Sequence, residues 1–165
     1  MIYIKKNKKT IDSCLEDKKA IVRYILAIIS RQQEMSSIAN YIAEDVEIYR
    51  DDLPSGGGLI WWCRWVRFLQ FIADRKMQGL ELREEQMIVK DNIVEVLARW
   101  HGTKNGKPIA SGDVPVRYQI DGDRVTKIWS YTTNYTFIHG DLIVYKPIFT
   151  LLFLRLCIYS WLNKY

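Results

Sequence analysis

Hydrophobic residues recur at helical spacing in the first part of the chain. The clearest repeat, three or four residues apart, comprises Ile21, Val22, Ile25, Leu26 and Ile29. This pattern predicts an amphipathic helix over residues 14–31. Ser13 and Glu16 have the spacing of a capping box, in which each side chain bonds the other's free backbone N–H, so we expect the helix to begin there. Residues 1–11 are then expected to form a frayed basic lead-in.

A second, shorter helix is expected to begin at Ser36 or Ser37. Apolar and polar positions then alternate at residues 46–50, which predicts a short strand. A third helix is predicted over residues 59–75. One stripe of it carries Trp62, Trp65, Val66, Leu69, Ile72 and Ala73. Such a stripe is typical of a helix packed on a sheet, and we prefer that interpretation to a dedicated aromatic cofactor site.

Beyond residue 77 the apolar period changes to two, which is the spacing of strands. Three dipeptides typical of hairpin turns interrupt it: Asp91-Asn92, Asn105-Gly106 and Asp121-Gly122. They divide this region into four predicted strands, at about residues 79–90, 93–103, 112–120 and 124–137. Consecutive hairpins indicate an antiparallel meander. Helices followed by strands indicate an α+β class, with the helices on one face of a curved sheet.

Composition and charge exclude several classes of protein and leave the predicted α+β fold unchanged. The chain has 165 residues, the size of one domain, and a net charge of +5, part of which comes from the lysine-rich residues 5–9. We interpret that run as a solvated tail and expect no nucleic-acid partner, because no recognition-helix or RNA-binding signature accompanies it. Three scattered cysteines and two histidines indicate neither a disulfide framework nor a metal site. A reducing cytoplasm is the expected location.

The last part of the chain is strongly apolar. Lys146 and Arg155 interrupt the apolar residues 142–162, and an arginine is costly inside a bilayer. We therefore expect this segment to close the core or a subunit interface, in preference to contacting a membrane. The chain then divides into a basic extension (1–13), a folded domain (14–139) and an apolar extension (140–165).

Four short segments follow one another in a characteristic order. They are Ile42-Ala43-Glu44-Asp45-Val46-Glu47-Ile48-Tyr49, Gly102-Thr103-Lys104-Asn105-Gly106, Ser111-Gly112-Asp113-Val114 and Asp121-Gly122-Asp123-Arg124-Val125-Thr126-Lys127-Ile128-Trp129. Together they resemble motifs of the SnoaL-like polyketide cyclase branch of the nuclear transport factor 2-like superfamily. The resemblance implies a cone-shaped α+β fold, with about three N-terminal helices packed on a strongly curved antiparallel meander sheet. It also implies one pocket for a hydrophobic small molecule, no cofactor, and a homodimer.

The strand at residues 93–101 has two different faces. One face carries Val94, Val96, Ala98 and Trp100. The other carries Glu95, Arg99 and His101. We expect the apolar face to be buried and the charged face to be solvated. If the charged face pointed into the cone instead, its members would form a ladder of ionisable groups.

The resemblance leaves two functions open. The first is a cyclase, isomerase or dehydratase that acts on a hydrophobic cyclic or polyketide-like substrate by general acid–base chemistry. Its candidate catalytic residues are Asp51, Asp52 and His101. The second is a non-catalytic ligand-binding or dimerisation module. SnoaL-like cyclases carry an acid late in the strand of Trp129, and Thr132-Thr133-Asn134 stand there instead, which favours the second function. Arg50 stands where related isomerases carry their general base, and Asp51 or Asp52 could serve after a small shift, which keeps the first function open. In either case the expected ligand-binding residues are Tyr49, Arg50, Trp65, Arg99, Arg117, Trp129 and Tyr131.

Overall fold

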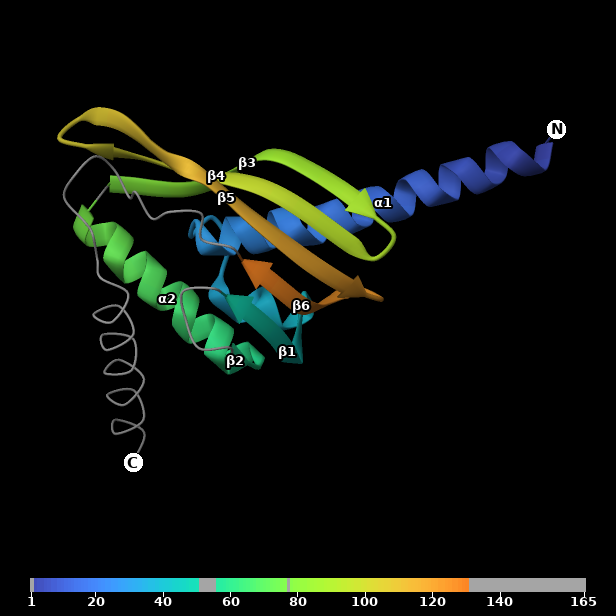
Figure 1. The fold of residues 1–165 in the computed structure, drawn as a ribbon, viewed down its shortest axis with the longest axis horizontal. Helices are drawn as coiled ribbons and strands as arrows, with labels where there is room; N and C mark the ends of the chain where they lie inside the picture. The colour runs from blue at the N-terminus through green and yellow to red at the C-terminus, as the bar shows by residue number, and fades with distance from the viewer. Residues whose placement is uncertain (1, 51–55, 77, 131–165) are drawn as a thin grey trace.

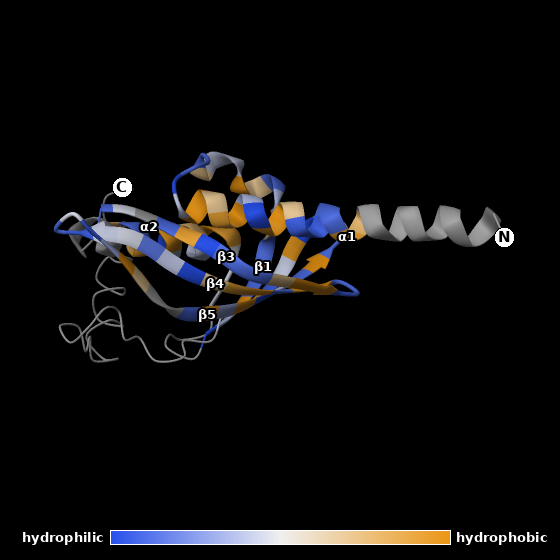
Figure 2. Ribbon diagram, turned by 90° about the horizontal axis from the view of Figure 1, so that it is seen from above, coloured by the Kyte–Doolittle hydropathy of each residue, from blue (hydrophilic) through white to orange (hydrophobic). Residues whose placement is uncertain are grey.

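The computed structural model describes residues 2–50, 56–76 and 78–130. In chain order the elements are α1 (Ile2–Ile29), the 3₁₀ helix η1 (Met35–Asn40), β1 (Ile42–Arg50), β2 (Gly56–Gly57), α2 (Leu59–Lys76), β3 (Gln78–Lys90), β4 (Ile93–Lys104), β5 (Lys107–Asp121) and β6 (Arg124–Ser130). Both α-helices lie on the same side of a long twisted sheet (Figure 1), and the same layers are seen from above in Figure 2. The face of the sheet that the helices cover is called the inner face here, and the opposite one the outer face.

The strands form one sheet in the order β2-β1-β6-β5-β4-β3. Strands β3 to β6 make the antiparallel meander that the three hairpin turns predicted. Asp91 and Asn105 have positive φ angles of 53°, and Gly122 has one of 67°, which is the geometry that these residue types tolerate in turns. β1 pairs with β6 in parallel, so the sheet is mixed. The predicted α+β cone is confirmed, and the parallel pair is an addition to it.

The core lies between the inner face and the two helices. On β4, the four apolar residues predicted to be buried are at most 7% exposed: Val94, Val96, Ala98 and Trp100. The helices contribute buried residues to the same cluster, among them Ile25 from α1 and Trp62 and Val66 from α2. Figure 2 shows apolar positions of the helices beside apolar positions of the strands. Trp62, Trp65 and Val66 of the predicted stripe are therefore buried, as its spacing indicated, while the burial of Ile72 and Ala73 lies outside what the structure describes.

Helix α1 is longer than its apolar repeat predicted. It begins at Ile2, so Ser13 lies inside the helix and the predicted capping box with Glu16 is wrong. The Glu16 carboxylate instead pairs with Lys19, at 2.7 Å. Residues 2–11, expected to be a frayed lead-in, are helical, because lysine is a good helix former and an existing helix extends at little cost. The first turns project beyond the sheet (Figure 1).

Three other boundaries differ from the predictions. The segment predicted as a helix from Ser36 or Ser37 is the 3₁₀ helix η1. Strand β1 begins at Ile42, earlier than predicted, because a register irregularity between Ile42 and Glu47 disturbs the alternation there. Strand β5 likewise begins before residue 112, at Lys107. These changes lengthen the sheet without altering the order of its elements.

Several predictions concern residues outside the described ranges. They are Asp51, Asp52, Tyr131, the end of the last predicted strand at 131–137, and the apolar segment 142–162. All of these stay predictions, as does the division of the chain into three parts. Within residues 2–50, 56–76 and 78–130, no helix has both the length and the apolar character needed to cross a bilayer.

Candidate functional site

The two faces of the sheet divide the residues that the sequence placed in one ligand site. Arg50 and Trp65 lie on the inner side, because Arg50 follows the buried Ile48 by two residues and Trp65 belongs to the buried stripe of α2. The remaining described candidates lie on the outer face: Tyr49, Arg99, His101, Arg117 and Trp129. The predicted residues therefore do not form a single site.

The inner group is a polar cluster at one end of the core. The guanidinium carbon of Arg50 lies 4.2 Å from the centroid of the Trp65 ring, in a cation–π arrangement. Arg50 Nη1 donates a long hydrogen bond of 3.5 Å to Ser130 Oγ. Ser130 is 7% exposed and therefore buried. Arg50, Trp65 and Ser130 are called the inner cluster below.

Pairing between strands and a close helix approach assemble this cluster. The parallel register of β1 and β6 sets Arg50 directly opposite Ser130. The N–H of Gly58 donates to the carbonyl of Val46 at 2.7 Å, which ties the start of α2 to β1. A Cβ atom on Gly56 would lie only 2.6 Å from the Trp61 indole, so this approach requires glycine. Trp65, one helical turn after Trp61, is thereby held over the end of β1.

Two inward polar residues were missed by the sequence analysis. Ser130 follows the buried Ile128 by two residues, so strict alternation along β6 would have placed it on the inner face. Tyr118 is 3% exposed on the same face of β5, and burial raises the pKa of its hydroxyl group. Both positions follow the alternation of buried residues along their strands, which is the sequence signal that places them on the inner face.

The outer face carries a row of paired residues across five strands. Register places them in the order Tyr49, Trp129, Arg117, Glu95 and Ile88, called the outer row below. The rings of Tyr49 and Trp129 stack with centroids 5.7 Å apart and an interplanar angle of 9°. The Tyr49 hydroxyl donates to the Glu47 carboxylate, which lowers the pKa of Glu47 and raises the pKa of Tyr49.

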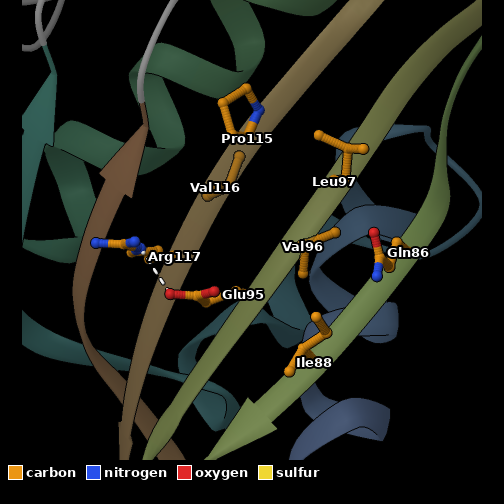
Figure 3. A pocket seen from close by; sticks show the side chains of 8 residues that line it. All are labelled: Gln86, Ile88, Glu95, Val96, Leu97, Pro115, Val116 and Arg117. Carbon is orange, nitrogen blue, oxygen red and sulfur yellow. Dashed lines mark ion pairs between the residues drawn. The ribbon is translucent and has the colours of Figure 1, made fainter.

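A hollow of about 390 Å³ lies beside this row, between β3, β4 and β5 (Figure 3). The ion pair of Arg117 and Glu95, at 2.9 Å, borders it, and Leu97 and Pro115 line its apolar part. Glu95 and Arg99 each keep 38% of their side chain exposed, so the prediction that they are solvated is confirmed. Arg99 pairs with Asp113 at 2.5 Å.

His101 lies far from the inner cluster. Ser130 is in register with Val116, and Val116 with Val96, so His101 is five residues further along β4 and on the opposite face. At about 3.4 Å per residue, that separation is roughly 17 Å along the strand. His101 Nε2 lies 3.2 Å from Glu85 Oε1, beside a second outer hollow of about 430 Å³. His101 is therefore too far from Arg50 and Ser130 to act together with them as a general acid–base.

Among the residues of known placement, no three histidine, cysteine, aspartate or glutamate side chains come together so that they could hold a metal ion.

Helices packed on the inner face of a curved mixed sheet form the nuclear transport factor 2-like fold, which solved structures of similar proteins share. A protein from Acidithiobacillus ferrooxidans proposed to be a polyketide cyclase superposes with a TM-score of 0.57 and 16% identity, over 69% of this chain and 86% of its own. An epoxide hydrolase of the LEH-like type from M. tuberculosis gives 0.54 and 12%, over 70% and 78%. A de novo designed protein with a curved β-sheet gives 0.54 and 18%, over 86% and 94%.

These similarities confirm the sequence-based resemblance at the level of the fold. No protein-family model matches the chain, and neither does any curated protein. These proteins are only 12% to 18% identical to this chain, and one of them is a designed protein. The similarities therefore establish the fold and do not indicate a reaction. Any function has to be argued from the inner cluster and the outer row themselves.

Proposed function

We propose that this chain binds a hydrophobic small molecule against the inner face of its sheet, between β1, β6 and α2. The observation that carries the proposal is the inner cluster, where Arg50 and the buried Ser130 meet over Trp65 in otherwise apolar surroundings. Small-molecule sites are typically apolar and aromatic, with a few polar groups that fix the orientation of the ligand. The inner cluster has that composition.

Catalysis is the second candidate function. Proteins similar in fold are described as a polyketide cyclase and an epoxide hydrolase, and an enzyme of cyclase, isomerase or dehydratase type would use Asp51 or Asp52 as a base. The specific observation in its favour is Arg50, because a fixed cation beside a ligand oxygen can stabilise a developing negative charge. Binding requires only Arg50, Trp65 and Ser130, whereas catalysis also requires a base.

A neutral probe tests whether the inner face holds a ligand. N-phenyl-1-naphthylamine is uncharged and becomes fluorescent in apolar surroundings. We expect the wild-type chain to bind it saturably at about one molecule per chain. Ser130→Leu places a bulkier apolar group inside the inner cluster, so it should weaken binding several-fold. Fluorescence titration measures both.

The matched control is Lys127→Leu, which introduces the same residue on the same strand but on the outer face. It should bind the probe as the wild type does, and circular dichroism should show that both variants are folded. Absence of saturable binding to the wild type, or loss of binding in Lys127→Leu alone, contradicts the proposal.

We also propose that the outer row contacts a second copy of this chain. Tyr49 and Ile88 are 38% and 42% exposed and lie at the two ends of the outer row, which Trp129, Arg117 and Glu95 make continuous between them. Glu95 and Arg117 lie side by side at the centre of the row. A two-fold axis there would present an opposite charge to each of them, which is the self-complementarity that a symmetric dimer requires.

Native mass spectrometry tests this contact. We expect the wild type to be dimeric and Ile88→Asp to be monomeric, because an aspartate would be desolvated at the interface. Ile60→Asp is the control, since Ile60 is 69% exposed on α2, away from the outer row. A monomeric wild type, or a dimer that Ile60→Asp disrupts and Ile88→Asp does not, contradicts the proposal.

A further inference from the structure

The side of α2 that faces away from the sheet carries exposed apolar residues. Among the residues that the structure describes, the large apolar side chains that are exposed belong to Tyr49, Ile60, Phe71 and Ile88. Tyr49 and Ile88 are members of the outer row. Ile60 and Phe71, which are 69% and 43% exposed, both lie on α2. This helix therefore presents apolar surface on the side that does not pack in the core.

Two arginines lie between these apolar residues. Ile60, Arg64, Arg67 and Phe71 are spaced three or four positions apart, so they form one stripe along the helix, opposite its buried face. At 1.5 Å per residue, the stripe is about 16 Å long. Arg67 is exposed and Arg64 is partly exposed. These four residues are called the outward stripe below.

The outward stripe is positively charged, with no acidic residue near it in the helix. Residues 56–73 contain neither aspartate nor glutamate. Within the part of the chain that the structure describes, no acidic side chain forms an ion pair with Arg64 or Arg67. A guanidinium stays charged in proteins and can bind phosphate or carboxylate oxygens through two parallel hydrogen bonds. The charge of the stripe therefore favours an anionic partner.

An anionic lipid surface matches both properties of the outward stripe. A helix that lies at a membrane interface places apolar side chains at the boundary of the acyl chains and basic side chains beside the headgroups. Ile60 and Phe71 stand at the two ends of the stripe, with the arginines between them. A nucleic acid would bind the arginines but would leave these two apolar side chains in contact with water. A lipid surface covers all four residues.

We propose that the outward stripe of α2 docks the protein on anionic membranes. Ile60 and Phe71 enter the headgroup region, and Arg64 and Arg67 bind the phosphate and carboxylate groups of the lipids. This inference is independent of the proposed function, because it requires no ligand on the inner face of the sheet. It assigns a partner to the face of α2 that the core does not cover.

Co-sedimentation of the full chain with lipid vesicles tests the proposal. Vesicles of phosphatidylcholine alone are compared with vesicles in which about a third of the lipid is phosphatidylserine. We expect the wild type to bind the anionic vesicles and not the neutral ones. The double variant Arg64→Gln/Arg67→Gln should weaken binding roughly tenfold or more, because two cations are removed from the lipid surface. Ile60→Ser should weaken binding several-fold, because it removes apolar area.

The matched control is Lys90→Gln/Arg124→Gln, which removes the same charge from two exposed residues at the end of β3 and the start of β6. It should bind anionic vesicles as the wild type does, and circular dichroism should show that all variants are folded. Equal binding of the wild type to both kinds of vesicle, or to neither, overturns the proposal. So does an equal loss of binding in the control, or unchanged binding in the arginine variant or in Ile60→Ser. Binding to a DNA duplex that the arginine variant abolishes, without binding to vesicles, would assign the stripe to nucleic acid instead.

Discussion

At the scale of single residues, the direction of a side chain decides which chemistry it serves. Tyr49 and Arg50 are neighbours in the sequence, yet one stacks on Trp129 outside the sheet and the other lies over Trp65 inside it. Because side chains alternate along a strand, two adjacent residues of β1 belong to two different sites. The inner cluster and the outer row are therefore independent, and substitutions in one should leave the other unchanged.

Asp121 offers a residue-scale test of the turn that joins β5 and β6. Its carboxylate accepts hydrogen bonds from Thr126 at 2.6 Å, and from Asn92 and Gln119 at 2.9 Å each. The bonds from Thr126, Asn92 and Gln119, in that order of effect, lower the pKa of Asp121. The lowered pKa stabilises the fold above the ordinary aspartate range, and this contribution disappears as the pH falls through the pKa of the folded state.

Removing the largest of these contributions should be visible directly. In Thr126→Val the shape is kept and the donor is lost, so we expect the pKa of Asp121 to rise toward its ordinary value. The NMR titration of the Asp121 carboxyl carbon measures the change. An unaltered titration curve would show that the hydroxyl of Thr126 does not act on this carboxylate.

Alternation along strands made the burial of many residues predictable, but not their partners. The apolar face of β4 followed from spacing alone, and so did the solvation of Glu95 and Arg99. The contact between Arg50 and Ser130 could not be foreseen, because it depends on a parallel pairing between strands far apart in the chain. Local patterns contain no information about such a register. For the same reason, the sequence did not reveal that His101 lies far from Arg50.

At the scale of elements, turns were more predictable than helix ends. The dipeptide Asn105-Gly106 requires positive φ angles at both residues, and the structure has them, at 53° and 75°. The start of α1 was misread because Ser13 and Glu16 match a capping box wherever they occur. A residue caps a helix only if the chain before it is not helical. The identities of two side chains do not reveal whether that is so.

The position of Ser13 inside α1 can be tested by one substitution. Alanine has a higher helix propensity than serine, so we expect Ser13→Ala to leave the free energy of unfolding unchanged or to raise it by about 0.5 kcal/mol. If Ser13 were the N-cap, the same change would lower it by about 1 kcal/mol. Urea denaturation followed by circular dichroism distinguishes a gain from a loss of this size.

At the scale of the whole molecule, the order of motifs predicted the fold although each motif is short. Helices followed by hairpin-linked strands admit few arrangements in which every apolar face is covered, and the cone is one of them. The function did not follow in the same way. The fold is shared by a protein proposed to be an enzyme and by a designed protein, so a function for this chain depends on the residues of the inner cluster and the outer row.

The central claim is that a ligand lies on the inner face, beside Arg50 and Trp65. The most direct test is ¹⁹F NMR of the chain labelled with 5-fluorotryptophan, with the resonances of Trp65 and Trp129 assigned from the Trp65→Phe and Trp129→Phe variants. Adding N-phenyl-1-naphthylamine should shift the Trp65 resonance and leave that of Trp129 in place, because the two rings lie on opposite faces of the sheet. A shift of Trp129 with an unmoved Trp65 would place the ligand on the outer face and contradict the account.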